Sequence, residues 1–381
     1  MTSMKKTKPS QNILIVAASE QDANLYYATR FIAPDPFVFF NIRGTKHLLM
    51  SDLEVDRAKH QADVDQVHST SKLAKAYRER TGERPSYIDL IADFAKQRRV
   101  RRLLVPADFP ISFADPLRKR GFQVEFKGNP FFERRTVKTK EEIQAITRAI
   151  RHVETAVGLA IQTLRKSVIR RGKLFYRGEK LTSESIKKII NVSLMENDCI
   201  AAHSIVSCGA HAVDPHDQGS GPLYANQSII MDIFPRDSKS RYFADFTRTV
   251  VRGTASPKLK RMYQAVQEGQ EIAFRTVRAG ADGHTIHQAI NKRFEELGFP
   301  TGVQNGRMQG FFHGTGHGLG LDIHEEPSIS GRPDILRAGH VVTVEPGLYY
   351  ADAGGVRLED VVVVTPAGCR NLTRFPKYLE I

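Results

Sequence analysis

Three histidines lie close together in a segment punctuated by glycine. Residues 313–327 read HGTGHGLGLDIHEEP, with histidines at positions 313, 317 and 324. Histidines four residues apart would share one face of a helix and could hold a metal ion there. The glycines at alternate positions from 314 to 320 oppose a helix, because each weakens it by roughly 1 kcal/mol. We therefore expect a strand or loop to present these imidazoles.

A pair of aspartates precedes this segment on sequence that is typical of a hairpin. The runs SIIMDIF and RYFADFTRTVV contain Asp232 and Asp245. If the turn is centred on Ser238 and Lys239, Asp232 faces Asp245 directly. Facing side chains have Cβ atoms ~5 Å apart, and like charges at that distance are destabilising. A cation shared by the two carboxylates would remove this penalty.

A second acidic pair follows the histidine segment. Glu345 in VVTVEPG is expected roughly opposite Glu359 in GVRLEDVVVV, across a loop tip near Asp352. Each residue alone would more commonly be a rim or turn residue. Together, four carboxylates on apolar strands and one or two imidazoles suit two hard or borderline divalent ions.

The elements around these residues indicate two domains. In residues 1–135, short apolar runs alternate with helical stretches, which predicts an α/β domain. The expected strands are NILIVAA, PFVFFNI, HLLMSD, RRLLVPA and FQVEF, and the expected helices are SKLAKAYRER and SYIDLIADFAKQ. A segment rich in charge, with Gly128 and Pro130, then marks the boundary.

Residues 136–381 combine helices with antiparallel hairpins, which predicts an α+β domain. Thr139 and Glu142 form a capping box at the start of a long amphipathic helix. Its apolar face recurs at helical spacing, at Ile143, Ile146, Ile150, Val153, Val157 and Ile161. Further on, Ser256 followed by Pro257 starts another helix.

The composition favours an intracellular globular protein over other classes. Three scattered cysteines in 381 residues indicate neither a disulfide framework nor a paired metal motif. The apolar run after the lysine-containing tail is too short for a secretory core, and we expect a buried strand after a frayed tail and a cytoplasmic location. The net charge of +14 could indicate nucleic-acid binding. The basic runs KQRRVRR and RKSVIRRGK lack interleaved aromatics, so we expect solvated faces, and neither a membrane nor a nucleic-acid partner.

The ordered motifs resemble those of a known peptidase family. The set MDIF, ADFTRT, HGTGHGLGLDIHEEP, VEPG and GVRLED is similar to that of the pita-bread-fold metallopeptidases. Within them it most resembles the Xaa-Pro dipeptidase (prolidase) and aminopeptidase P branch. The resemblance implies a pita-bread catalytic domain and two divalent metal ions per subunit, with Mn²⁺ expected first and Co²⁺, Zn²⁺ or Fe²⁺ as alternatives.

The same resemblance assigns five metal ligands by position. Asp232 and Asp245 would be ligands, with Asp245 bridging the two ions. His317 would be the single imidazole ligand. Glu345 would bind one ion, and Glu359 would be the second bridge.

The resemblance also assigns catalytic and substrate-binding residues. His324 would stabilise the oxyanion during hydrolysis of the bond that precedes proline. His216 would meet the leaving group or the substrate amide, and Glu345 would carry a proton to the leaving nitrogen. His313 and Arg357 would bind substrate, or else pack behind the site.

Several alternatives remain open. The first expectation is cleavage of Xaa-Pro dipeptides by a homodimer, whose front domain would serve oligomerisation and close the cleft. Aminopeptidase P action on longer peptides is close behind. A non-catalytic binding module and a metal-free hydrolase resembling creatinase are disfavoured, because the ligand set is complete. Phe234 and Pro235 stand where the family often has glycine two residues after the first aspartate, which affects the pocket and hence the substrate.

Overall fold

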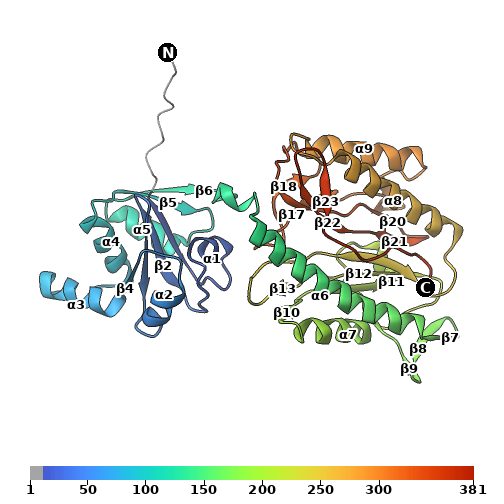
Figure 1. Cartoon of the computed structure of the whole chain (residues 1–381), viewed down its shortest axis with the longest axis horizontal. Helices are drawn as coiled ribbons and strands as arrows, with labels where there is room; N and C mark the ends of the chain where they lie inside the picture. Colours follow the sequence, from blue (N-terminus) through green and yellow to red (C-terminus); the bar gives the residue numbers. More distant parts are fainter. Residues whose placement is uncertain (1–11) are drawn as a thin grey trace, which may run out of the picture. The chain divides into compact units, whose positions relative to one another are not determined.

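The computed structural model describes residues 12–381, so the tail expected before the first strand lies outside the described residues. The chain divides into two compact units, one ending at Phe132 and the other beginning at Glu133 (Figure 1). Arg135, expected at the end of the first domain, makes ion pairs with Asp322 and Glu325 of the second unit.

The first unit is built on a six-stranded mixed sheet. Its strands, in spatial order, are β4 (Gln66–Ser69), β3 (Thr45–Met50), β2 (Phe37–Ile42), β1 (Ile13–Ala17), β5 (Arg102–Pro106) and β6 (Gln123–Lys127). The pairs β1–β2 and β2–β3 are antiparallel, and the pairs β1–β5, β5–β6 and β3–β4 are parallel. All five strands predicted in this region are present.

Helices cover both faces of this sheet, which explains why its central strands are continuously apolar. Leu14 faces a core shared with α4 (Tyr87–Gln97) and α5 (Ile111–Lys119). The next residue, Ile15, faces a second core shared with α1 (Ala23–Thr29) and α2 (Val55–Gln61). Helix α3 (Thr70–Thr81) buries none of its residues. The predicted α/β class is confirmed for this unit.

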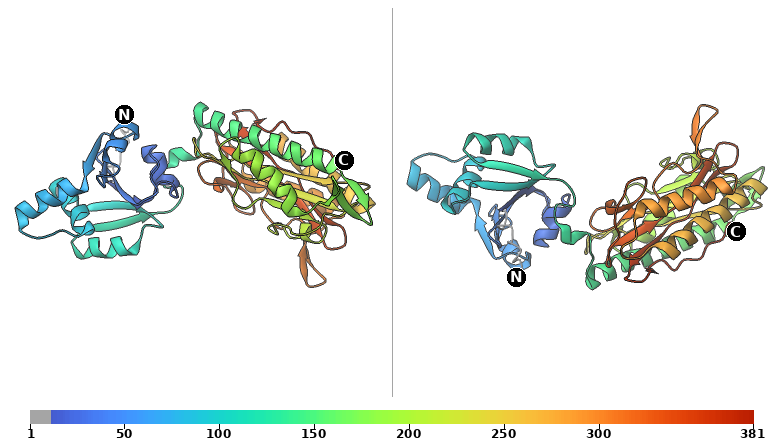
Figure 2. Two further views of the ribbon diagram at one scale, coloured as in Figure 1. Left: turned by 90° about the horizontal axis from the view of Figure 1, so that it is seen from below. Right: turned by 90° about the horizontal axis from the view of Figure 1, so that it is seen from above.

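In the second unit, two pairs of helices enclose the strands. Helices α6 (Lys140–Arg165) and α7 (Ser183–Met195) lie on one side, and α8 (Pro257–Thr276) and α9 (Gly283–Glu296) lie on the other, as the two opposite views in Figure 2 show. The Thr139–Glu142 capping box is present at the start of α6. Ser256 caps α8, with proline as the first helical residue.

The strands between these helices form two main sheets, which adjoin through a hairpin. One sheet has the order β11 (Ile205–Cys208), β12 (Ser228–Asp232), β14 (Thr247–Val251). The other has the order β18 (Glu325–Ile329), β17 (Gly316–Gly318), β19 (Val341–Val344), β22 (Asp360–Val364), β23 (Cys369–Asn371). The hairpin of β20 (Gly347–Tyr350) and β21 (Gly354–Arg357) lies between β19 and β22 in the chain, and β21 contacts β12 and β14 of the first sheet, so the hairpin links the two sheets.

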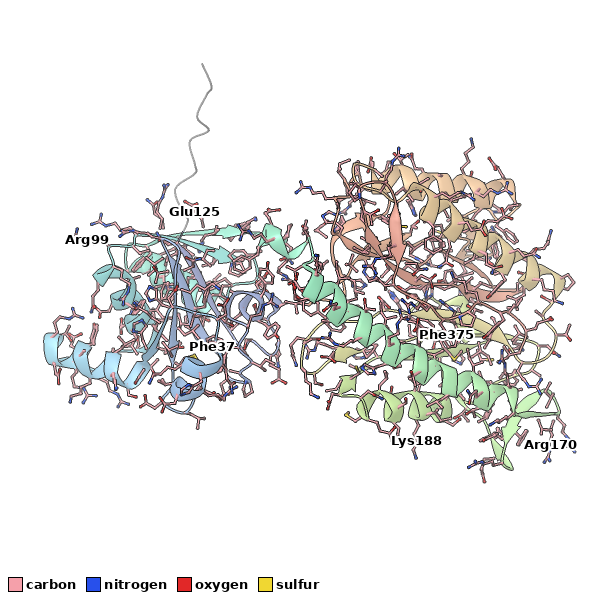
Figure 3. The ribbon with its side chains drawn as sticks, viewed as in Figure 1. Phe37, Arg99, Glu125, Arg170, Lys188 and Phe375 are labelled. Carbon is pink, nitrogen blue, oxygen red and sulfur yellow. The ribbon has the colours of Figure 1, made fainter. Side chains whose placement is uncertain are left out.

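Shorter elements complete the second unit. They are η1 (Glu133–Arg135), β7 (Val168–Arg170), β8 (Lys173–Tyr176), β9 (Glu179–Lys180), β10 (Cys199–Ile200), η2 (His211–Val213), β13 (Arg236–Asp237), β15 (Gly302–Gln304) and β16 (Arg307–Gln309). The C-terminal segment runs along α6, with Phe375 near Gly158 and Tyr378 near Arg165, and the ring of Phe375 meets that of Phe246 edge-on at 5.5 Å (Figure 3).

Two sequence-level expectations concern the chain as a whole. All three cysteines are free thiols, in agreement with the absence of a predicted disulfide framework. Among residues 12–381, none of the helices has the length and apolar character that a membrane span requires.

Candidate metal centre

The first aspartate pair comes from the hairpin of β12 and β14, but not in the predicted register. Asp232 pairs with Thr247, and Asp245 lies two residues before β14 begins. The prediction that Asp232 faces Asp245 is therefore wrong. The reason is the turn: the Asp237 carboxylate accepts hydrogen bonds from the backbone N–H groups of residues 239 and 240. That arrangement lengthens the turn and shifts the pairing by two residues.

The second acidic pair has the predicted register. Val344 pairs with Asp360 on one side, and Gly347 pairs with Arg357 on the other. Both pairs belong to one register, which places Glu345 opposite Glu359. The structure confirms this prediction.

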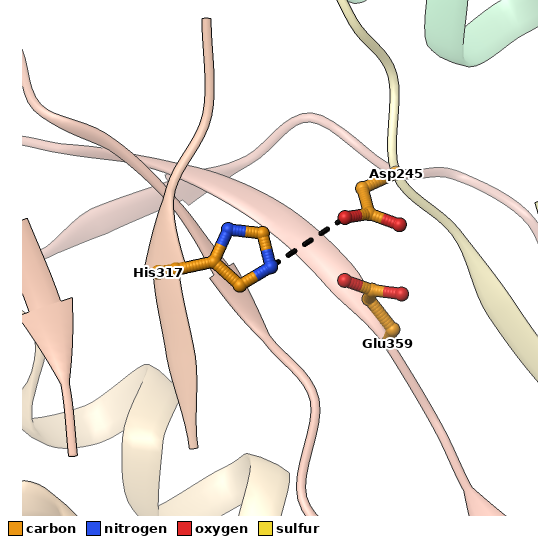
Figure 4. A group of neighbouring side chains, drawn as sticks. All are labelled: Asp245, His317 and Glu359. Atoms are coloured by element: carbon orange, nitrogen blue, oxygen red, sulfur yellow. Dashed lines mark ion pairs between the residues drawn. The ribbon is translucent and has the colours of Figure 1, made fainter. Parts of the chain in front are cut away.

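His317 lies on strand β17, and its ring points at the carboxylates. Its Nε2 atom is 3.3 Å from Glu345 Oε1 and 3.6 Å from Asp245 Oδ2. The potential ligand atoms of Asp245, His317 and Glu359 all lie within 4.8 Å of one another (Figure 4). A strand presents the histidine, as expected. At Gly316 a Cβ atom would lie 2.0 Å from the carbonyl oxygen of Thr343, so only glycine allows this close approach.

The orientation of His317 leaves its Nε2 atom available as a ligand. Its Nδ1 atom lies 3.1 Å from the carbonyl oxygen of Gly318 and donates a hydrogen bond to it. This contact fixes the tautomer in which Nε2 carries a lone pair, as is usual for a metal-bound histidine. Without a cation, that lone pair would face two carboxylates. In the metal-free protein, burial opposes the charged ring, but Glu345 and Asp245 outweigh it and raise the pKa of His317.

The carboxylates carry more negative charge than nearby cations balance. Asp245 and Glu359 are buried. Burial raises the pKa of both well above its usual value, and the charges of Asp232 and Glu345 raise it further. One oxygen of Asp232 and one of Glu359 are buried without a hydrogen-bond partner among the described residues. Buried unpaired carboxylate oxygens fit a bound divalent cation, since the alternative is a large desolvation penalty.

Two threonines that sequence reasoning missed hold these carboxylates. Thr247 donates a hydrogen bond to Glu359 Oε2 at 2.8 Å, and Thr343 donates one to Glu345 Oε1 at 3.2 Å. Thr343 lies two residues before Glu345, on the same face of the strand. Period-two alternation therefore gave a signal for Thr343, whereas Thr247 required the true hairpin register.

Arg357 is buried and donates a hydrogen bond to Asp232, one of the candidate metal ligands. It is 3% exposed, and it donates hydrogen bonds to Asp232 Oδ2 at 2.6 Å and to the Tyr349 hydroxyl at 2.7 Å. Because the Tyr349 oxygen accepts from Arg357, its O–H is left to donate to His313 Nε2, 3.0 Å away. Tyr349 was missed at the sequence level, because nothing in the run GLYY distinguishes it from a core tyrosine.

Both ring nitrogens of His313 are therefore engaged within the protein. Nδ1 donates to the carbonyl oxygen of Gly314 at 2.8 Å, while Nε2 accepts from Tyr349. Burial lowers the pKa of His313 to about 4, so the ring is neutral. A substrate hydrogen bond to either nitrogen of His313 would have to replace one of these contacts.

The remaining predicted residues line one pocket with the ligand candidates. The pocket has a volume of about 600 Å³, and its walls include His216, Phe234, His313, His324 and Arg357 together with all five predicted ligands. The ring of His324 meets that of His317 edge-on, with centroids 4.3 Å apart. Burial and the neighbouring His317 lower the pKa of His324. The structure thus brings together every residue singled out for the site.

The sequence profile of metallopeptidase family M24 matches residues 144–366, more than half of the chain. The chain belongs to this family. The matched range contains all five predicted ligands and the four further site residues. Membership of family M24 makes the protein a hydrolase of the metallopeptidase class, which agrees with the carboxylate-rich pocket.

Two curated relatives of this M24 member have the same printed description. A Xaa-Pro dipeptidase from Pyrococcus horikoshii is 25% identical over 336 residues, which cover 87% of this chain and 85% of that protein. A Xaa-Pro dipeptidase from Pyrococcus furiosus is 29% identical over 247 residues, which cover 64% of this chain and 65% of that protein.

Solved structures share the fold over nearly the full length. An X-Pro aminopeptidase from Thermotoga maritima has a TM-score of 0.80 at 23% identity and covers 97% of both chains. A Xaa-Pro dipeptidase from Bacillus anthracis has a TM-score of 0.80 at 24% identity, over 97% of this chain and 95% of that one. The α/β front unit and the α+β pita-bread unit, both predicted from the sequence, are confirmed.

Proposed function

We propose that this protein is a Xaa-Pro dipeptidase that binds two divalent metal ions per subunit. The observation that carries the proposal is the approach of Asp245, His317 and Glu359 within 4.8 Å, with the His324 ring beside His317 in the same pocket. The printed descriptions of the Pyrococcus relatives support the choice of Xaa-Pro substrates.

Five residues would hold the ions. Asp232 and Asp245 would bind from the first hairpin, Glu345 and Glu359 from the second, and His317 from β17 through Nε2. Carboxylate oxygens with a single imidazole suit Mn²⁺, and Co²⁺, Zn²⁺ or Fe²⁺ can use the same donors. Divalent ions in such a site supply Lewis acidity and make water nucleophilic near neutral pH.

The other residues of the pocket would bind the substrate and move protons. His324 would donate a hydrogen bond to the carbonyl oxygen of the bond that precedes proline, where negative charge develops. Glu345 would carry a proton to the leaving nitrogen. His216 is exposed at the same pocket and would meet the substrate amide. Arg357 would hold Asp232 in place, which leaves substrate binding to His216, His324 and the pocket walls.

The second candidate is aminopeptidase P activity on longer peptides. It is favoured by the likeness to the X-Pro aminopeptidase from Thermotoga maritima, whose TM-score of 0.80 equals that of the dipeptidase from Bacillus anthracis. Phe234 lines the pocket where the family often has glycine, so it narrows the space for substrate side chains.

Metal reconstitution followed by substrate comparison tests the proposal. Metal-free protein is loaded separately with Mn²⁺, Co²⁺, Zn²⁺ and Fe²⁺, and hydrolysis of Ala-Pro, an Ala-Pro-Xaa tripeptide and Ala-Ala is measured. We expect Ala-Pro to be cleaved fastest and Ala-Ala not at all. Preference for the tripeptide would establish the aminopeptidase alternative. Absence of stoichiometric metal in loaded, folded protein would refute the metallopeptidase proposal.

The remaining expectations concern the whole assembly. We infer that the front unit, residues 1–135 in the sequence-level division, serves oligomerisation and helps to close the cleft in a homodimer. Light scattering on purified protein tests the dimer, and a monomeric mass would contradict it.

The cytoplasmic location stays a prediction from the sequence, and cell fractionation tests it. A gel shift with nucleic acid is expected to show no binding, because the basic runs lack interleaved aromatics.

A further inference from the structure

The loop that carries His324 is organised around the carboxylate of Glu325. This side chain is only 7% exposed although the loop lies at the surface of the pocket. Its Oε1 atom accepts hydrogen bonds from the backbone N–H groups of Leu321 at 3.0 Å and Asp322 at 3.1 Å. At Gly320 a Cβ atom would lie 2.5 Å from Oε2. The carboxylate therefore folds back into its own loop, and glycine at 320 leaves room for it.

Two cations from a distant part of the sequence complete this arrangement. Arg135 donates to Glu325 Oε1 at 2.5 Å, and Lys138 donates to Glu325 Oε2 at 2.6 Å. Arg135 also donates to Asp322 Oδ2 at 2.8 Å. The side chains of Arg135 and Lys138 are 8% and 2% exposed, so water screens these pairs little. We call Glu325, Arg135 and Lys138 the loop clamp.

The two cations of the loop clamp face two carboxylates, those of Glu325 and Asp322. Burial alone would raise the pKa of Glu325, but Lys138 and Arg135 outweigh it and lower the pKa below its usual value. Glu325 is therefore ionised at neutral pH. Removing one member would leave a buried charge with fewer partners, which is strongly destabilising for the local structure.

His324 depends on the backbone of this loop for its position. Within residues 12–381 the His324 ring makes no hydrogen bond, and its only ring contact is with His317. The backbone that carries it is fixed by Glu325, by the bond from Phe243 N–H to the Gly320 carbonyl at 2.8 Å, and by the bond from Leu319 N–H to the Val341 carbonyl at 3.0 Å. A shift of the Glu325 carboxylate would therefore move the imidazole directly.

We propose that the loop clamp of Glu325, Arg135 and Lys138 positions His324 for catalysis. This inference rests on the proposed function, in which His324 contacts the reacting amide. Arg135 and Lys138 lie directly after the boundary at Glu133 and before residue 144, where the match to family M24 begins. They act through Glu325 and are positioning residues that need not touch the substrate.

A double-mutant cycle separates positioning from general stability. Lys138→Met is compared with the wild-type protein, and the same substitution is repeated in a His324→Ala background. We expect Lys138→Met to lower kcat for Ala-Pro about 10- to 100-fold, as for other residues that orient a catalytic group, while KM changes less than about threefold. In the His324→Ala background we expect less than about a twofold further loss, because there is no imidazole left to misplace.

Matched variants make the cycle decisive. Lys138→Arg keeps the charge and should restore most of kcat. Glu326→Gln alters the exposed neighbouring carboxylate and should leave kcat within about twofold of wild type, since it does not touch the loop clamp. Bound metal per subunit should be unchanged in all of these variants. An equal loss of kcat with and without His324 would overturn the proposal.

Amide hydrogen exchange gives a readout that does not need catalysis. Glu325→Gln should speed exchange at the amides of residues 321 and 322, and Glu326→Gln should not. If Lys138→Met fails to fold, Glu325→Gln takes its place in the cycle. If the wild-type protein has no peptidase activity while the amides of residues 321 and 322 are protected from exchange, the proposed function is disproved and the loop clamp is not. Peptidase activity combined with unchanged exchange in Glu325→Gln would disprove the loop clamp.

Discussion

Replacing Asp245 by asparagine should have opposite effects on stability with and without metal. In the metal-free protein Asp245 is buried close to other carboxylates, and its potential ligand atom lies within 4.8 Å of that of Glu359. Two unit charges at that separation repel by ~3.5 kcal/mol at an effective dielectric constant of ~20. Burial, and after it the charges of Asp232 and Glu345, raise the pKa of both groups, so protonation relieves part of this repulsion. We expect Asp245→Asn to stabilise the metal-free protein by ~1–2 kcal/mol.

The metal-bound protein should respond in the opposite direction. A ligand at 100 times its dissociation constant stabilises the folded state by ~2.7 kcal/mol. Asparagine keeps the shape of the side chain but loses the charge, so Mn²⁺ should stabilise the folded variant little. For a unit of this size, 1 kcal/mol changes Tm by ~2–4 °C. We therefore expect Tm to rise by ~2–8 °C in EDTA and to fall below wild type in excess Mn²⁺.

Thermal unfolding in EDTA and in excess Mn²⁺ measures both effects. The matched control is Asp360→Asn, one residue beyond Glu359. Asp360 is equally buried, but it pairs with Arg248 at 2.8 Å and with Lys377 at 2.6 Å. Its loss should lower Tm in both conditions, because it leaves two cations underpaired. Two results together would refute the reasoning that Asp245 lies beside other carboxylates because it binds a cation. They are a Tm of Asp245→Asn in EDTA below that of the wild type, and a rise in the Tm of this variant with Mn²⁺ as large as that of the wild type.

Three further outcomes follow from the site and from the front unit. His324→Gln should keep full metal content by elemental analysis and lose about 100-fold or more in kcat, and loss of metal would show that its role is misassigned. Tyr349→Phe removes the hydroxyl between Arg357 and His313, so titration with Mn²⁺ should show about 10-fold weaker binding; unchanged affinity would contradict a role for Tyr349 in holding Arg357. In the front unit, burial and then the charge of Arg98 lower the pKa of His68 from 6.5 to about 4. Its share of the folding free energy is complete above pH 6.5 and is lost as pH falls towards 4, so a calorimetric pH dependence that is unchanged in His68→Gln would refute this.

Local signals predicted the elements that have strong, repeated patterns. The central strands of the first unit's sheet were found because they are apolar on both faces, whereas the edge strand β4 was missed because its run QVHS has no apolar repeat. Helices α1 and α2 were missed because each has only seven residues, too few for a helical repeat to stand out. Helix α5 was missed because it contains Pro116, which usually ends a helix. Tertiary packing overrides the weak local preference at all three places.

The amino-acid sequence by itself determined which residues carry the chemistry and part of their arrangement. Alternate glycines excluded a helix at His317. Glu345 and Glu359 are equally far from Asp352 in the sequence, which fixed them as facing residues, because in a hairpin with a regular turn the paired residues follow from counting outward from the turn. Both predictions needed only local rules.

Only the tertiary structure decided the features that depend on distant or irregular contacts. The register of Asp232 depends on a turn that the Asp237 side chain lengthens, which a count of residues does not reveal. Lys138 reaches Glu325 across a sequence separation of 187 residues. No local pattern encodes such a pair, because burial brings the two charges together only after the strands between them have packed.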